Sequence, residues 1–128
     1  MDVLASRIIL RPNDPEVSQR FYRDTLGLAV FREFGPAESP GMVFFAGQGL
    51  IEVSGRSTAP GSASTAIWLQ VRDVAQEYTR LATAGVQILR EPRQEFWGLI
   101  EMWIADPDGN RLVLVQIPED HPLRRDTR

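Results

Sequence analysis

Short stretches of alternating or continuous hydrophobic residues predict eight β-strands, four in each half of the chain. A predicted helix follows the first strand of each half. The predicted strands cover residues 6–11, 28–34, 41–46 and 50–54 in the first half, and residues 65–71, 86–90, 99–105 and 111–117 in the second. The order of elements is therefore βαβββ, repeated once.

The two predicted helices begin with similar signals. Asp14 precedes Pro15, which is typical of a helix start because an Asp side chain accepts hydrogen bonds from the first turn and Pro needs no acceptor there. Asp73 is the corresponding cap of the second helix, with Gln76 three residues later. Apolar residues then recur at helical spacing: Val17, Phe21, Tyr22 and Leu26 in the first helix, and Val74, Tyr78, Leu81 and Ala82 in the second.

The two halves also match residue by residue. Residues 26–33 (LGLAVFRE) align with residues 84–91 (AGVQILRE), with identical Gly, Arg and Glu. Gly27 and Gly85 lie where a left-handed residue ends a helix. We therefore expect a single α+β domain, residues 1–128. It comprises a first module (5–54), a linker rich in Gly, Ser and Pro (55–64), a second module (65–117) and a polar tail (118–128).

Composition limits the partners and the compartment. Hydrophobic residues make up 43% and charged residues 24%, as in ordinary globular proteins. The net charge is -3 and the cations are scattered, which argues against nucleic acid as a partner. No apolar run approaches the ~20 residues of a membrane span. The chain has no cysteine, so nothing points to an oxidising compartment, and we expect a cytoplasmic protein.

Two motifs carry a resemblance to a known family. Residues 21–28 (FYRDTLGL) follow the first helix, and residues 106–110 (DPDGN) form a predicted tight turn before the last strand. At this separation within a repeat, they resemble the vicinal-oxygen-chelate superfamily of glyoxalases, bleomycin-resistance proteins and extradiol dioxygenases. The resemblance covers roughly residues 5–117. It implies a U-shaped cleft of mixed β-sheet with the helices outside, commonly completed in a homodimer.

Metal-dependent members of that family carry a His, Glu or Gln ligand on the first and last strand of each repeat. Carried over to this sequence, the four positions fall on Arg7, Glu52, Ala66 and Val113. A guanidinium group and two alkyl groups cannot coordinate a divalent cation, so one ligand of four remains. The lone His121 lies in the tail, where we expect it to be exposed to solvent. The resemblance therefore implies a member with no metal and no cofactor.

The same positions define the predicted lining of the cleft, because side chains of a strand alternate between its faces. The inward-facing residues are Arg7, Ile9, Glu52, Ala66, Trp68, Gln70, Val113 and Val115, and the residues between them pack beneath the helices: Ile8, Leu10, Ile51, Val53, Ile67, Leu69, Leu112 and Leu114. Arg7 either neutralises the Glu52 carboxylate or holds a polar or anionic part of a ligand.

Aromatic residues point to the kind of ligand. Trp68, Trp97 and Trp103 all lie in the second repeat, with Phe96 beside Trp97. Flat rings offer a large contact area to planar molecules, although packing in the core or at a dimer interface also explains them. Trp97 is the strongest candidate, because it precedes Gly98 between two strands, where binding members of the family often carry a similar pair at the rim of the cleft.

These observations favour a homodimer that binds a small planar or aromatic molecule, with sequestration of an antibiotic as one such role. The expected ligand-binding residues are Arg7, Ile9, Glu52, Trp68, Gln70, Trp97, Trp103 and Val113. The alternative is a lyase, isomerase or dioxygenase of the same superfamily, with or without a divalent metal. Glu52 is then the candidate base, since an apolar cleft raises the pKa of a carboxyl group. A third hypothesis is a structural partner whose cleft is filled by side chains.

Overall fold

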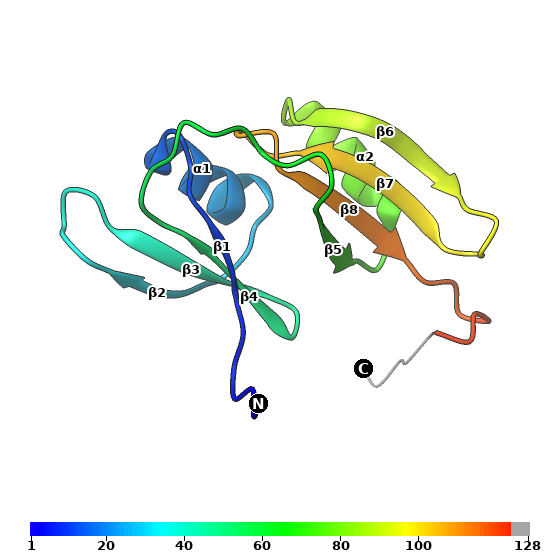
Figure 1. The fold of residues 1–128 in the computed structure, drawn as a ribbon. Helices are drawn as coiled ribbons and strands as arrows, with labels where there is room; N and C mark the ends of the chain where they lie inside the picture. The colour runs from blue at the N-terminus through cyan, green and yellow to red at the C-terminus, as the bar shows by residue number, and fades with distance from the viewer. Residues whose placement is uncertain (124–128) are drawn as a thin grey trace. The chain divides into compact units, whose positions relative to one another are not determined.

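The computed structural model describes residues 1–123 of the chain. It divides into two compact units, of which the first is Met1–Gly61 and the second begins at Ser62. The first unit contains β1 (Ile8–Leu10), α1 (Pro15–Arg20), η1 (Phe21–Thr25), β2 (Val30–Phe34), β3 (Gly41–Ala46) and β4 (Gly49–Val53) (Figure 1). The second contains β5 (Ala66–Gln70), α2 (Val74–Thr83), β6 (Gln87–Gln94), β7 (Ile100–Ala105) and β8 (Arg111–Gln116).

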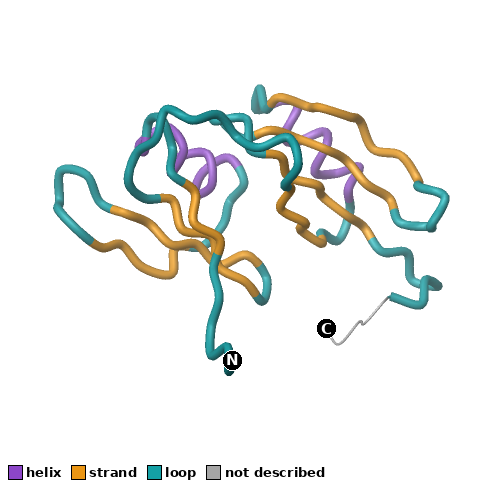
Figure 2. The backbone as a smooth tube through the Cα atoms, viewed as in Figure 1, coloured by secondary structure: helices purple, strands orange, loops and turns teal. Residues whose placement is uncertain are grey.

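The predicted α+β class and the two βαβββ repeats are confirmed, as Figure 2 shows by its succession of strands and helices. The boundary between the units lies within residues 55–64. The U-shaped cleft and the single domain stay predictions. Within residues 1–123, no helix is long and apolar enough to cross a bilayer.

Each unit is built around a four-stranded mixed sheet. The strand order is β1-β4-β3-β2 in the first unit and β5-β8-β7-β6 in the second. In both, the first and last strands of the repeat run parallel and the other pairs are antiparallel. Ile9 pairs with Glu52, and Trp68 pairs with Val113. The positions singled out on first and last strands therefore lie side by side within each sheet.

One face of each sheet packs against the helix of its own unit. In the first unit, Tyr22 from η1 is fully buried and its ring lies 6.1 Å from that of Phe44 on β3. In the second unit, Val74 and Leu81 of α2 are fully buried with Leu112 of β8. We call the opposite side of each sheet its helix-free face. Each helix covers one face of its own sheet. The polar and aromatic candidate residues on the strands therefore lie on the helix-free face.

The predicted ends of the elements are confirmed at the helix caps and the last turn. The Asp14 carboxylate accepts hydrogen bonds from two backbone N–H groups of the first turn, and Asp73 accepts one from the Gln76 N–H at 3.0 Å. Gly27 and Gly85 have φ values of 79° and 81°, in the left-handed region. The Asp106 carboxylate accepts hydrogen bonds from the backbone of residues 108 and 110, which closes the turn before β8.

The first helix differs from its prediction. Regular α-helix stops at Arg20, and residues Phe21–Thr25 form a wider π-turn. The Leu26 N–H donates to the Phe21 carbonyl at 2.8 Å, a bond that spans five residues instead of four. The apolar spacing does not distinguish the two geometries. The side chains of Phe21 and Tyr22 are buried in the wider turn.

Some strand boundaries and burial patterns also differ. β1 is shorter than residues 6–11, and Ile8, expected beneath the helix, is 45% exposed because β1 is an edge strand. β6 continues to Gln94, beyond the predicted residue 90, through two irregularities in its pairing with β7. The other residues predicted to pack beneath the helices are buried or half-buried: Leu10, Ile51, Val53, Ile67, Leu69, Leu112 and Leu114.

Candidate functional site

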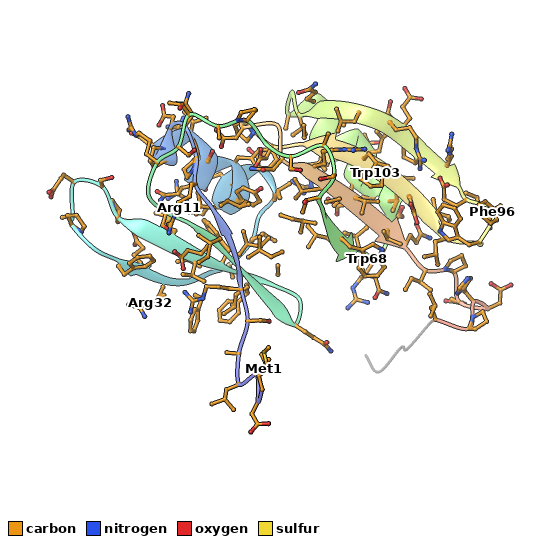
Figure 3. The ribbon with its side chains drawn as sticks, in the orientation of Figure 1. Met1, Arg11, Arg32, Trp68, Phe96 and Trp103 are labelled. Atoms are coloured by element: carbon orange, nitrogen blue, oxygen red, sulfur yellow. The ribbon has the colours of Figure 1, made fainter. Side chains whose placement is uncertain are left out.

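Glu52 lies at the centre of a charged cluster on the helix-free face of the first unit. The Ser54 hydroxyl donates to its Oε2 at 2.5 Å, and Nη1 of Arg7 donates to its Oε1 at 3.0 Å. Nη1 of Arg11, labelled in Figure 3, lies 3.8 Å from Oε2 and donates to the Ser54 hydroxyl at 2.6 Å. The predicted pairing of Arg7 with Glu52 is therefore present, and two further side chains complete the cluster.

This environment lowers the pKa of Glu52. The hydrogen bond from Ser54 and the charges of Arg7 and Arg11 lower the pKa, and they outweigh burial, which acts in the opposite direction. The expectation of a raised pKa was wrong, because the site supplies donors where an apolar cleft would not. A carboxylate whose two oxygens are already hydrogen-bonded and whose pKa is low is a weak general base.

The four positions carried over from metal-dependent relatives do not fit a divalent cation. Arg7 is itself a cation bonded to Glu52, Ala66 is an exposed methyl group, and Val113 is an isopropyl group with 4% of its surface exposed. Among residues 1–123, no three His, Asp or Glu side chains are grouped closely enough to hold a metal ion. The side chains at these four positions therefore do not fit a divalent metal ion.

The helix-free face of the second unit carries an aromatic row. Val113 on β8 pairs with Trp68 on β5 and with Trp103 on β7, so the three side chains point to the same side of the sheet. Trp68 is 51% exposed, and Trp103 is half-buried against the cluster of Val113 and its neighbours. Val113 therefore lies between the two tryptophans in the pairing across the sheet, with 4% of its surface exposed. Val115, also predicted to face inward, is fully buried beside it.

Trp97 lies outside this row, in the turn between β6 and β7. Its indole N–H donates to Oε2 of Glu101 at 2.9 Å, and Trp97 remains 45% exposed. Gly98 follows with φ of 96°. His121 packs here: its Nε2 lies 2.8 Å from the Trp97 carbonyl oxygen. His121 is in the tail as predicted, but it is half-buried and hydrogen-bonded, which corrects the expectation of an exposed residue.

The predicted site residues therefore fall into three places. Arg7 and Glu52 are together in the first unit with Ile9, which is 49% exposed. The second unit brings together on one face Trp68, Gln70, Trp103 and Val113. Trp97 lies at the β6–β7 turn beside Glu101.

Sequence reasoning missed several polar residues beside these candidates. Ser54 follows Glu52 by two residues and Arg111 precedes Val113 by two, so strand alternation places each on the same face as its neighbour. That signal was present in the sequence. The hydrogen bond from Trp97 to Glu101 connects a turn to a strand, and no simple spacing predicts it.

Comparison with known protein families identifies the family that the sequence resembles. The model of the Glyoxalase/Bleomycin resistance protein/Dioxygenase superfamily matches residues 5–114 of the chain. No curated protein sequence is significantly similar to it.

Solved structures of similar fold come from several bacteria. A member of the glyoxalase/bleomycin resistance protein/dioxygenase superfamily from Sphaerobacter thermophilus is 23% identical, with a TM-score of 0.75 over 90% of this chain and 98% of that chain. A glyoxalase-related enzyme from Fulvimarina pelagi is 25% identical, with a TM-score of 0.72 over 92% and 90%. TioX from a Micromonospora species is 18% identical, with a TM-score of 0.72 over 88% and 95%.

Proposed function

The chain belongs to the Glyoxalase/Bleomycin resistance protein/Dioxygenase superfamily. We propose that it binds a small planar or aromatic molecule and that it does so without a metal ion. One observation carries this proposal. Three of the four strand positions that supply metal ligands in the family hold Arg7, Ala66 and Val113, and the carboxylate of the fourth, Glu52, is bonded to Ser54 and Arg7.

The side chains that remain suit binding. Trp68, Ile9 and Trp97 are each about half exposed, at 51%, 49% and 45%. Exposed aromatic and aliphatic groups gain free energy when a flat ligand removes them from water, and side chains held on a sheet, such as Trp68 and Ile9, lose little conformational freedom. The proposal therefore assigns binding to these surfaces, with Arg7 and Gln70 as polar contacts.

We extend the proposal to sequestration of a natural product, such as an antibiotic, by a cytoplasmic homodimer. Sequestration needs affinity and no reacting group, which agrees with a Glu52 carboxylate whose oxygens already have partners. The description of the superfamily includes bleomycin resistance proteins, so a role of this kind has a place within it.

Titration with a panel of planar natural products tests binding, because a ring stacked on an indole quenches its fluorescence. We expect saturable quenching by at least one compound, reduced in Trp68→Phe. A panel that gives no saturable response argues against the proposal. Elemental analysis of the purified protein tests the absence of a metal: stoichiometric Zn, Ni, Mn or Fe, lost in Glu52→Gln, would overturn that part.

A further inference from the structure

Two arginines share one carboxylate in the charged cluster of the first unit. Nη1 of Arg7 lies 3.0 Å from one oxygen of Glu52, and Nη1 of Arg11 lies 3.8 Å from the other. Within residues 1–123, these three side chains form no other ion pair. Two positive charges therefore meet one negative charge, and the cluster keeps an excess of one positive charge.

Most donors of these two arginines are also unused. In the described part of the chain, Arg7 and Arg11 contact other polar groups only through Nη1. The Nε and Nη2 groups of a guanidinium donate side by side, in a fork that matches two oxygens of an acidic group. This fork has no protein partner on either arginine, and the two side chains are 35% and 52% exposed to solvent.

The protein holds both guanidinium groups in position. Arg7 is bonded to Glu52, which is 8% exposed. Nη1 of Arg11 donates to the carbonyl and the hydroxyl of Ser54, at 3.2 and 2.6 Å. The Arg11 side chain also lies against Gly55, where an added Cβ would be 3.1 Å from Cδ of Arg11. Donors that are already held in place lose less conformational freedom when a ligand binds.

An apolar side chain accompanies these charges. Ile9 lies two residues from Arg7 and two from Arg11 along the chain, and it pairs with Glu52 across the sheet. Ile9 is 49% exposed, and such a surface gains free energy when a ligand covers it. A molecule with an anionic group and an apolar part can therefore make both kinds of contact here.

We propose that Arg7 and Arg11 together bind a carboxylate group of the ligand, with the apolar part of the ligand on Ile9. This inference rests on the proposed function and names the charged group of its ligand. One bound carboxylate balances the excess charge of the cluster, whereas a neutral ligand of the same shape leaves it unbalanced. A cationic ligand is repelled by the same charge.

Benzoate and benzamide test this inference, since they share a ring and differ in charge. We expect NMR titration of the wild-type protein to give about tenfold tighter binding of benzoate, the scale of one charged hydrogen bond. The backbone amide signals of Ile9 and Ser54 shift and saturate as benzoate is added. Sodium chloride weakens benzoate binding and leaves benzamide binding constant, because salt screens only the charged contact.

Arg11→Gln is the decisive variant, because Glu52 keeps both of its hydrogen bonds in it. It removes the preference for benzoate and leaves the benzamide affinity unchanged. Arg11→Lys keeps the charge without the fork, so it retains part of the preference. Arg20→Gln is the matched control: Arg20 lies on α1, is 54% exposed against 52% for Arg11, and pairs with Glu16. It removes the same charge and keeps the full preference.

The outcomes separate the two proposals. Equal affinity for both compounds, or a preference for benzoate that survives Arg11→Gln, overturns the carboxylate inference while aromatic binding stands. If neither compound binds although the natural-product panel quenches the fluorescence, the inference is overturned alone. If benzoate binds as expected and no natural product gives a response, the inference stands and the sequestration role is removed. No binding in either experiment removes both.

Discussion

Glu52 shows how one residue changes its role when its neighbours change. A carboxylate with 8% of its surface exposed is unfavourable unless it has partners. The resemblance implies that in metal-dependent members of the family the partner at this position is a cation. Here the guanidinium of Arg7 and the hydroxyl of Ser54 take that place, at 3.0 and 2.5 Å. The positive charge at this point of the sheet is thus provided by the chain itself.

The lowered pKa of Glu52 predicts a pH-dependent contribution to stability. A carboxyl group whose pKa is lowered by folding stabilises the protein fully above its ordinary pKa of 4.5, and this contribution is lost as the pH falls through the lowered folded value. We expect Glu52→Gln to reduce the free energy of unfolding by about 1.5–3 kcal/mol at neutral pH, the range for hydrogen bonds to a charged group. Urea denaturation at a series of pH values measures it.

The difference between wild type and Glu52→Gln should shrink on acidification. A difference that stays constant with pH would contradict the assignment of this cluster. Glu16→Gln serves as the control, because Glu16 forms only an exposed pair with Arg20 at 3.2 Å, and such pairs contribute little.

At the scale of elements, the sequence predicted most of the framework. Caps and turns depend on local contacts, so Asp14, Asp73 and Asp106 were identified from their neighbours alone. The π-turn after Arg20 was not, because the same apolar residues satisfy four- and five-residue spacing. The short β1 and the long β6 depend on pairing with another strand, which a single sequence does not specify.

The candidate site was predictable to the same degree. Alternation along the strands placed Glu52 beside Arg7, and Trp68 on one face with Val113. Trp103 was a candidate only for its aromatic ring, and the pairing of β7 with β8 brings it to the same face. It did not predict that Val113 would be buried, because that depends on the side chains of the two flanking strands. Spacing along the strand likewise does not predict the orientation of long side chains such as Arg11.

The β6–β7 turn provides a prediction at this scale. Gly98 has φ of 96°, and a Cβ added there would lie 2.8 Å from Cδ2 of His121. Gly98→Ala therefore combines backbone strain of about 1 kcal/mol with displacement of the tail residue. Gly85→Ala is a matched control, since Gly85 has φ of 81° and open space around it.

We expect both substitutions to destabilise the protein, with the larger loss for Gly98→Ala. NMR signals of the single histidine should shift only in Gly98→Ala. Equal losses of stability with an unchanged histidine signal would mean that the contact between the tail and this turn has no effect on the fold.

At the scale of the whole molecule, exposed apolar side chains of the first unit support the predicted homodimer. Phe31 and Phe45 are each 46% exposed, with ring centres 5.1 Å apart. Such a group on a small unit is a surface that another chain can cover. We expect light scattering to give twice the mass of one chain.

Phe45→Glu should shift the protein towards the monomer by placing a charge within this surface. Val17→Glu, at a residue of α1 that is 40% exposed, should leave the mass unchanged. A wild-type protein that remains monomeric at high concentration would contradict the homodimer.

All three tryptophans belong to the second unit, which makes their emission an optical reporter for half of the chain. Circular dichroism, by contrast, records the backbone of both halves. Coincident melting curves from the two methods would mean that the repeats unfold in one cooperative step. A dichroic transition without a matching change in emission would belong to the first repeat. The two methods together therefore distinguish unfolding of one repeat from unfolding of the other.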